Sequence, residues 1–237
     1  MIAKAVEADL FAQLSQEFGD RMAELEALES LGRLSRMQRG DGVEALGYVE
    51  RALALAEDLE AEEKRNHLLN TLGLLQWKLG HYEEALTVYQ RALDNFRRRG
   101  DQVHEGLMLN SIGVVLRDMH RLDDALEPLH QALTVNRRCG QRRLEAHSLA
   151  VLGDVYSRLD KVKEALVQYE ASLAMRRELG DRTGEGWMLL RIAQAEASRA
   201  QWDRALDYAT QALTVAEATG DLQLEAECKR LSDSSTP

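Results

Sequence analysis

A spaced set of glycine, alanine and leucine residues recurs along this chain of 237 residues with a period of 40. The set comprises Gly73, Ala85, Leu86, Ala92 and Leu93, which return as Gly113, Ala125, Leu126, Ala132 and Leu133, and then as Gly153, Ala165, Leu166, Ser172 and Leu173. A fixed period of this length is typical of a tandem array, in which one supersecondary unit stacks on the next. We therefore expect the function to lie on a surface shared by several repeats.

Each period predicts a hairpin of two helices. In residues 61–100, leucines recur at steps of three and four up to Leu79, Gly80 interrupts the run, and a second run of the same kind follows. This spacing puts apolar side chains on one helix face, and a pair such as Gly180-Asp181 ends one helix and begins the next. The predicted helices are 20–38, 43–58, 61–79, 82–99, 101–119, 122–139, 141–159, 162–179, 181–199 and 202–219.

The pattern divides the chain into five repeats with a half-repeat at each end. The predicted boundaries are 1–19 for an N-terminal half-repeat or capping helix, 20–60, 61–100, 101–140, 141–180 and 181–220 for the repeats, 221–231 for a C-terminal capping helix and 232–237 for a disordered tail. Lys229 stands where the repeats have Leu69 and Leu109, and a charged residue at a stacking position predicts the end of the stack.

The composition disfavours two classes of partner. The formal net charge is −10, and binding to nucleic acid needs a basic face that neutralises phosphates. No stretch approaches the roughly 18 apolar residues of a membrane-spanning helix. The first residues carry Glu7, Asp9 and Glu17 and lack the apolar core of a secretory signal. We expect a cytoplasmic protein that binds neither nucleic acid nor membrane.

The sequence lacks the motifs of catalytic and cofactor sites. It contains no Gly-x-x-x-x-Gly-Lys-Ser/Thr loop, no His-Glu-x-x-His pair and no Gly-x-Ser-x-Gly elbow. The histidines do not have the spacing of metal ligands, and Cys139 and Cys228 have no Cys-x-x-Cys partner. We therefore expect a protein that is not an enzyme and that uses no cofactor and no metal.

Small residues inside the predicted helices indicate close packing between helices. A glycine inside a helix costs about 1 kcal/mol relative to alanine, yet glycine recurs at one position of the first helix in four repeats, as Gly32, Gly73, Gly113 and Gly153. The close approach of a neighbouring helix explains this choice. Paired alanines serve the same purpose on the second helix, with a large residue between them, namely Tyr89, Leu129 or Tyr169.

This order of Leu, Gly, Ala, aromatic and Ala resembles the tetratricopeptide repeat over about residues 20–231. The period is longer than the usual length of about 34 residues, and this longer form resembles the repeats of kinesin light chains, of spindle-orientation adaptors and of bacterial signalling proteins. HEAT and armadillo repeats, the alternative, have units of about 40 residues but lack the glycine and paired-alanine signature. The resemblance implies an all-α fold, a right-handed α-α superhelix (solenoid) of antiparallel helix hairpins.

In this family the first helix of each repeat lines a concave groove, so the resemblance implies that partners bind there. The residues that the repeat register places on this groove are Arg33, Arg36, His67, Asn70, Leu74, Trp77, Lys78, Leu107, Asn110, Val114, Arg117, His147, Asp154, Arg158 and Trp187.

Two pairs among these residues have alternative interpretations. Asn70 and Asn110 occupy equivalent positions, and their carboxamides either hold the backbone of an extended peptide or are ordinary solvated groups. Trp77 and Trp187 are either binding hot spots or packing residues. A third tryptophan, Trp202, begins a second helix and is predicted to belong to the core.

The basic residues of the groove also have two interpretations. Arg33, Lys78, Arg117 and Arg158 form either a cationic track for an acidic peptide or part of a balanced surface. The second interpretation is favoured because acidic residues lie among them, namely Glu26, Glu29, Asp118 and Asp154.

The resulting hypothesis is a non-catalytic adaptor, a protein–protein interaction scaffold whose concave groove binds a peptide or a partner segment. The alternative is the regulatory or sensor array of a bacterial signalling protein, either peptide-responsive or self-associating. The N-terminal half-repeat either caps the first hairpin or pairs with another copy of the chain, and the second alternative would give a homodimer through terminal helices. Its large apolar residues are Leu10, Phe11, Leu14 and Phe18.

Overall fold

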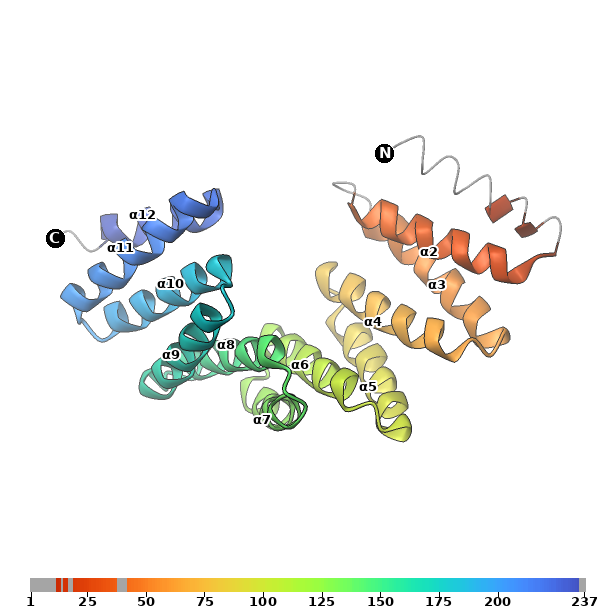
Figure 1. Ribbon diagram of the computed structural model, residues 1–237, viewed down its shortest axis with the longest axis horizontal. Helices are drawn as coiled ribbons and strands as arrows, with labels where there is room; N and C mark the ends of the chain where they lie inside the picture. The colour runs from red at the N-terminus through yellow and green to blue at the C-terminus, as the bar shows by residue number, and fades with distance from the viewer. Residues whose placement is uncertain (1–11, 14, 17–18, 38–41, 235–237) are drawn as a thin grey trace. The chain divides into compact units, whose positions relative to one another are not determined.

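The computed structural model describes residues 12–13, 15–16, 19–37 and 42–234, and the regular elements in that part of the chain are helices (Figure 1). The chain divides into two compact units, residues 1–101 and 102–237. Unit 1 contains α2 (Arg21–Met37), α3 (Gly42–Asp58), α4 (Glu62–Lys78) and α5 (Tyr82–Arg99). Unit 2 contains α6 (Gln102–Asp118), α7 (Leu122–Arg138), α8 (Arg142–Arg158), α9 (Val162–Glu178), α10 (Arg182–Ser198), α11 (Trp202–Thr219) and α12 (Leu222–Ser234).

The helices of the five repeats begin and end within one residue of the predicted bounds. The prediction for the end of the chain is wrong, because α12 continues to Ser234 where a disordered tail was expected from residue 232. Most of the N-terminal half-repeat, including Leu10, Phe11, Leu14 and Phe18, lies outside the described residues. Of its described residues, Ala12 is buried with Ala27 and Leu31 of α2.

The turn between α9 and α10 contains the predicted glycine that ends one helix and the predicted aspartate that caps the next. At the end of α9, Gly180 has a φ of 67°, a left-handed conformation that glycine adopts without steric cost. The next residue, Asp181, caps α10, since its Oδ1 accepts a hydrogen bond of 3.0 Å from the amide of Gly184. Asp221 caps α12 in the same way through the amide of Leu224. These short turns make consecutive helices antiparallel neighbours.

The glycines of the first helices lie directly against the large residues of the second helices. A Cβ built on Gly73 would stand 2.7 Å from the Tyr89 ring, and one built on Gly113 would stand 2.4 Å from Leu129. The paired alanines are fully buried, as at Ala85 and Ala92. The predicted close packing within each hairpin is therefore confirmed, and the small residues form a buried seam.

Within each unit, every helix packs on the next one in the chain. In unit 2, one buried cluster extends from Ala150 of α8 through Leu166 and Leu190 to Leu224 and Cys228 of α12. Cys228 is a free thiol, and burial, followed by the charges of Glu227 and Asp221, raises its pKa to about 11.

Buried glutamates join the end of one hairpin to the start of the next. Glu185 of α10 is 5% exposed and pairs with Arg177 of α9 at 2.8 Å and with Arg182 at 2.7 Å. Glu145 makes the equivalent pair with Arg137, 40 residues earlier in the chain. The arginines near the ends of α7 and α9 therefore hold the following helix, which is a structural use of these charges.

One predicted core residue is exposed. Trp202 begins α11 and is 47% exposed, whereas the sequence pattern assigned it to the core. The equivalent residue of α9, Val162, packs against the buried cluster, which contains residues of α10 and α11.

Candidate functional site

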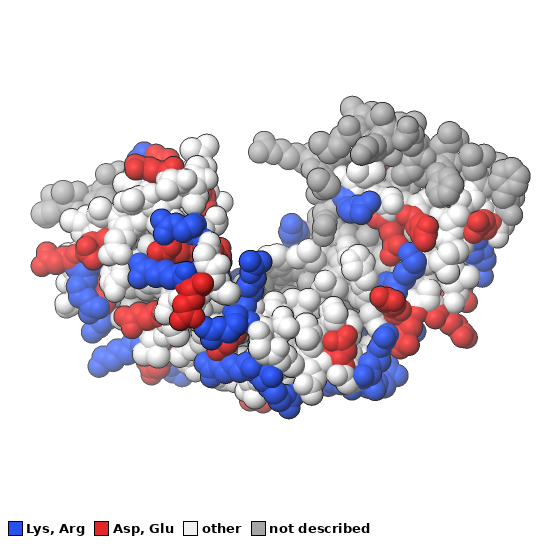
Figure 2. Space-filling model, viewed as in Figure 1, with Lys and Arg blue, Asp and Glu red and all other residues white. Residues whose placement is uncertain are grey.

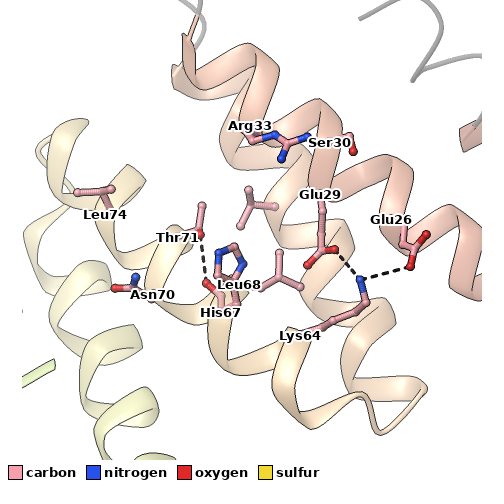
Figure 3. A pocket seen from close by; sticks show the side chains of 11 residues that line it. Glu26, Glu29, Ser30, Arg33, Lys64, His67, Leu68, Asn70, Thr71 and Leu74 are labelled. Carbon is pink, nitrogen blue, oxygen red and sulfur yellow. Dashed lines mark hydrogen bonds and ion pairs between the residues drawn. The ribbon is translucent and has the colours of Figure 1, made fainter. Parts of the chain in front are cut away.

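A pocket of about 630 Å³ lies between α2 and α4 in unit 1 (Figure 3). Both are first helices of their hairpins, so the pocket opens on the face where the sequence places partner binding. Its lining mixes charged, polar and apolar side chains: Glu26, Glu29, Ser30 and Arg33 of α2, Val49 of α3, and Lys64, His67, Leu68, Asn70, Thr71 and Leu74 of α4. Four of the predicted site residues, Arg33, His67, Asn70 and Leu74, are among them.

The two carboxylates at one end of this pocket are paired with a lysine that also lines it. Lys64 Nζ donates a hydrogen bond of 2.8 Å to Glu29 Oε2 and lies 3.7 Å from Glu26 Oε1, as Figure 3 shows. The hydrogen bond to Glu29 is the main cause that raises the pKa of Lys64. Because this ammonium is committed to two carboxylates, the exposed cation of the lining is Arg33, one turn farther along α2.

The α4 wall of the pocket presents groups of both hydrogen-bonding kinds. Thr71 Oγ1 donates to the backbone carbonyl of His67, so its hydroxyl keeps its acceptor capacity. The half-buried Asn70 carboxamide has two donors and an acceptor. Beside them the half-buried Leu74 supplies apolar surface, while Leu68 is buried beneath the pocket. This combination of a few polar groups on an apolar wall suits a peptide, in which amides alternate with side chains.

Three predicted site residues of unit 1 lie elsewhere. The Arg36 side chain is outside the described part of the structure. Trp77 is half-buried and Lys78 is exposed, both at the end of α4, and neither lines the pocket.

In unit 2 the predicted site residues form a network of ion pairs across the first helices. Arg117 of α6 makes a bidentate contact with Asp118, at 2.9 and 3.1 Å, and bonds to Asp154 of α8 at 3.0 Å. Asp154 also accepts a hydrogen bond of 2.9 Å from the Tyr169 hydroxyl. Arg191 of α10 approaches the same carboxylate at 3.4 Å.

The network leaves its outer arginines accessible. Arg117 is only 15% exposed; burial lowers its pKa, but the two carboxylates outweigh this effect, so that the pKa is raised. Arg158 is 43% exposed and donates to the backbone carbonyl of Arg117 at 3.0 Å. On the face seen in Figure 2, acidic and basic side chains are interspersed. These ion pairs favour the interpretation of the basic residues as part of a balanced surface and disfavour a continuous cationic track.

The two asparagines at equivalent positions differ in their surroundings. Asn110 is 3% exposed, and its Nδ2 lies 2.6 Å from Nδ1 of His147, whereas Asn70 lines the open pocket of unit 1. Burial, followed by the positive charges of Arg176 and Arg117, lowers the pKa of His147, although the residue as a whole is exposed. The neutral imidazole is therefore the form that this site favours.

Trp187 is held by structural contacts. Its ring packs on the buried cluster of unit 2, and its indole nitrogen donates to Asp221 Oδ2 at 3.1 Å. Asp221 is the residue that caps α12, so Trp187 links α10 to the last helix. The remaining predicted residues of unit 2, Leu107 and Val114, are half-buried on α6.

Several residues of these sites were not predicted from the sequence. Lys64 lies three residues before His67, and Arg191 lies four residues after Trp187, so helical spacing could have placed both on the first-helix face. Tyr169 belongs to a second helix and was assigned to packing alone. Its hydroxyl reaches Asp154 only because the ring crosses the hairpin seam beside Gly153.

In the described part of the chain, no group of three or more His, Cys, Asp or Glu side chains could hold a metal ion. None of the described helices is both long and apolar enough to cross a membrane.

Solved structures similar to this one are arrays of the predicted kind. BtubC (BKLC) from P. vanneervenii superposes with a TM-score of 0.77 at 18% identity, over 92% of this chain and 91% of that one. The TPR-like repeats of a putative kinesin light chain from Podosopora anserina give 0.68 at 16% identity, over 83% and 96%.

A third similar structure is a regulator. The Rap conjugation gene regulator of the plasmid pLS20, solved in complex with the Phr* peptide, gives a TM-score of 0.74 at 17% identity, over 91% of this chain and 59% of that one. None of the curated proteins compared with the chain matches it in sequence.

The family itself is identified by sequence. The family model described as tetratricopeptide repeat matches residues 24–98 and 105–178, which together make up more than half of the chain. The match, with the hairpins and their glycine seam, confirms the fold class predicted from the 40-residue period. This chain belongs to the tetratricopeptide repeat family.

Proposed function

We propose that the chain is a non-catalytic interaction scaffold that holds a peptide, or an extended segment of a partner protein, against its first helices. The observation that carries this proposal is the pocket between α2 and α4, which combines Arg33, Asn70 and the apolar Leu74 in one lining. Tetratricopeptide repeat proteins are generally non-catalytic scaffolds, and the family match supports the same role here.

The lining suggests how such a segment would be held. The Asn70 carboxamide would pair with a backbone amide of the segment, because it offers a donor and an acceptor side by side. Arg33 would receive a carboxylate of the segment, and Leu74 would contact an apolar side chain.

The proposal assigns a role in holding the segment to Asn70 and not to Asn110. Asn110 already contacts His147 inside unit 2, so a substitution there would disturb packing as well as any binding. A test of the pocket therefore uses Asn70 and Arg33, whose loss leaves the described core intact.

The experiment begins with peptides selected by display on the immobilised protein and then measures their affinities in solution. Asn70→Ala and Arg33→Ala should each weaken a selected peptide about tenfold, as expected for the loss of one hydrogen bond to a charged or amide group. Gln90→Ala is the matched control, because Gln90 is an exposed carboxamide on α5 that lies outside the pocket. Unchanged affinities in both pocket variants would contradict the proposal.

A second candidate function is a regulatory array that responds to a peptide. The similarity to the Rap conjugation gene regulator, solved with the Phr* peptide, favours it. In this case the selected peptide should change the conformation of the whole chain as well as bind. Small-angle scattering with and without peptide would separate the two candidates, since a passive scaffold keeps its scattering curve and a responsive array does not.

A further inference from the structure

The pocket between α2 and α4 carries opposite charges at its two ends. At one end Glu26 and Glu29 share the single ammonium of Lys64, which leaves one negative charge in excess. At the other end lies the guanidinium of Arg33, which is exposed and forms no ion pair with another described residue. Figure 3 shows Arg33 on a separate turn of α2, with Lys64 turned toward the two carboxylates.

Glu26 is the carboxylate that remains accessible to a bound segment. Its side chain is 62% exposed, and Lys64 Nζ lies 3.7 Å from it, which is beyond hydrogen-bond distance. Glu29 is only 23% exposed and accepts the hydrogen bond of 2.8 Å from the same ammonium. The lysine is therefore bound mainly to Glu29, and the Glu26 carboxylate keeps acceptor capacity for a further donor.

The helix α2 sets the distance between the two accessible charges. Glu26 and Arg33 are seven residues apart, which corresponds to two turns of an α-helix and about 10.5 Å along its axis. This spacing returns to the same side of the helix, and both side chains line the pocket. The lining of the α4 wall extends from Lys64 to Leu74, so the pocket is elongated along both helices.

We propose that the segment bound in this pocket carries one basic and one acidic side chain, about three residues apart. The inference rests on the proposed function and adds the charge pattern of the segment. Its basic side chain contacts Glu26 and its acidic side chain contacts Arg33. In the polyproline II conformation three residues span about 9.3 Å and return to the same side of the chain, close to the spacing of the two charges on α2. The backbone has no internal hydrogen bonds in this conformation, so its amides are available to the Asn70 carboxamide.

A segment with charges of only one sign is disfavoured in this pocket. A wholly acidic segment would place a carboxylate beside Glu26, and a wholly basic segment would place a cation beside Arg33. Like charges at close range repel each other, so the pocket discriminates by repulsion as well as by attraction. Both charged groups are open to solvent, and salt should therefore weaken the discrimination.

The test is a set of double-mutant cycles on the full chain with a display-selected peptide whose binding is weakened by Asn70→Ala. Fluorescence anisotropy of the labelled peptide gives the Kd of the wild type, Glu26→Gln and Arg33→Gln. Each protein is also measured with peptides in which the basic or the acidic residue is replaced by alanine. Glu26→Gln should weaken the intact peptide about three- to fivefold, the upper range for an accessible ion pair, and should not affect the peptide that lacks its basic residue.

Arg33→Gln should show the same dependence on the acidic residue of the peptide, and both couplings should shrink at high salt. Glu50→Gln is the matched control, because Glu50 is an exposed carboxylate of α3 outside the pocket lining. It removes the same charge and should leave the Kd unchanged. Every variant alters an exposed side chain, and circular dichroism verifies that each one folds.

The two proposals fail in different ways. Selected peptides that depend on Asn70 but carry no basic residue would overturn the charge pattern and leave the scaffold function in place. A basic residue whose contribution does not couple to Glu26 would have the same consequence. If no selected peptide depends on Asn70 or Arg33, the proposed function and the charge pattern are both rejected.

Discussion

The backbone of Gly153 in α8 lies against the ring of Tyr169 in α9. A Cβ on Gly153 would stand 2.5 Å from Cδ1 and Cε1 of that ring, a distance that real side chains do not adopt. The hydroxyl of the same ring donates to Asp154, the residue after Gly153. One tyrosine thus closes the hairpin seam and joins the ion-pair network on the first helices.

Gly153→Ala should destabilise the fold by about 1–3 kcal/mol, because the added methyl group forces the Tyr169 ring and its hydrogen bond to move. Urea unfolding followed by circular dichroism measures the effect. Gly47→Ala is the control, since Gly47 is inside α3 and a Cβ there meets nothing within 4 Å. It should stabilise the chain by about 0.5–1 kcal/mol through helix propensity. Equal effects of the two changes would contradict the packing explanation.

Ala200→Gly should raise the melting temperature. Ala200 follows α10 with a φ of 57°, in the left-handed conformation that costs about 1–2 kcal/mol for a residue with a side chain. Gly80 holds the equivalent place after α4. Relief of this strain exceeds the entropy that glycine adds to the unfolded chain. Ala197→Gly, inside α10, should instead lower the melting temperature, so a decrease in both variants would refute the assignment of strain.

Glu185→Gln should lower the free energy of unfolding by about 1–3 kcal/mol. The carboxylate is buried and paired with Arg177 and Arg182, and an amide replaces two charge-assisted bonds with weaker ones. Glu178 of α9, which pairs with Arg142 at the surface, provides the comparison. Glu178→Gln should have almost no effect, because exposed ion pairs contribute little. Denaturant midpoints of the two variants distinguish a buried clamp from a general loss of charge.

The stability of unit 2 should fall as the pH drops through the range in which histidine titrates. The folded chain holds the pKa of His147 below its ordinary value of 6.5, so the unfolded chain binds the proton more readily. The contribution of His147 is therefore present above pH 6.5 and is lost as the pH falls through the folded pKa. His147→Gln should flatten the dependence of the unfolding free energy on pH between about 7 and 5.

His81→Gln is the control for this pH dependence, because it removes an exposed histidine of unit 1 that precedes α5. Its unfolding free energy should follow the wild-type dependence on pH. If His147→Gln and the wild type show the same slope, the imidazole does not couple proton binding to folding.

The end of α12 and the exposure of Trp202 show where sequence periodicity is insufficient. The apolar pattern stops near Leu231, which packs against the buried cluster, yet the helix continues to Ser234 with polar residues. Trp202 has the same position in its repeat as Val162, so the pattern treats them alike. Their burial differs because it depends on the tertiary contacts of each helix, which no local sequence window contains.

The sequence by itself determined the helices, their pairing into hairpins and the glycine seam, because these depend on spacings of a few residues and on a strict period. The tertiary structure decided which polar groups meet. Arg117 and Asp154 are 37 residues apart in the chain, as are Asn110 and His147, and each pair forms only when consecutive first helices are stacked. The repeat register places a residue on one face of its helix. Its hydrogen-bond partner, however, belongs to the neighbouring repeat, and the side chains at that position differ from one repeat to the next.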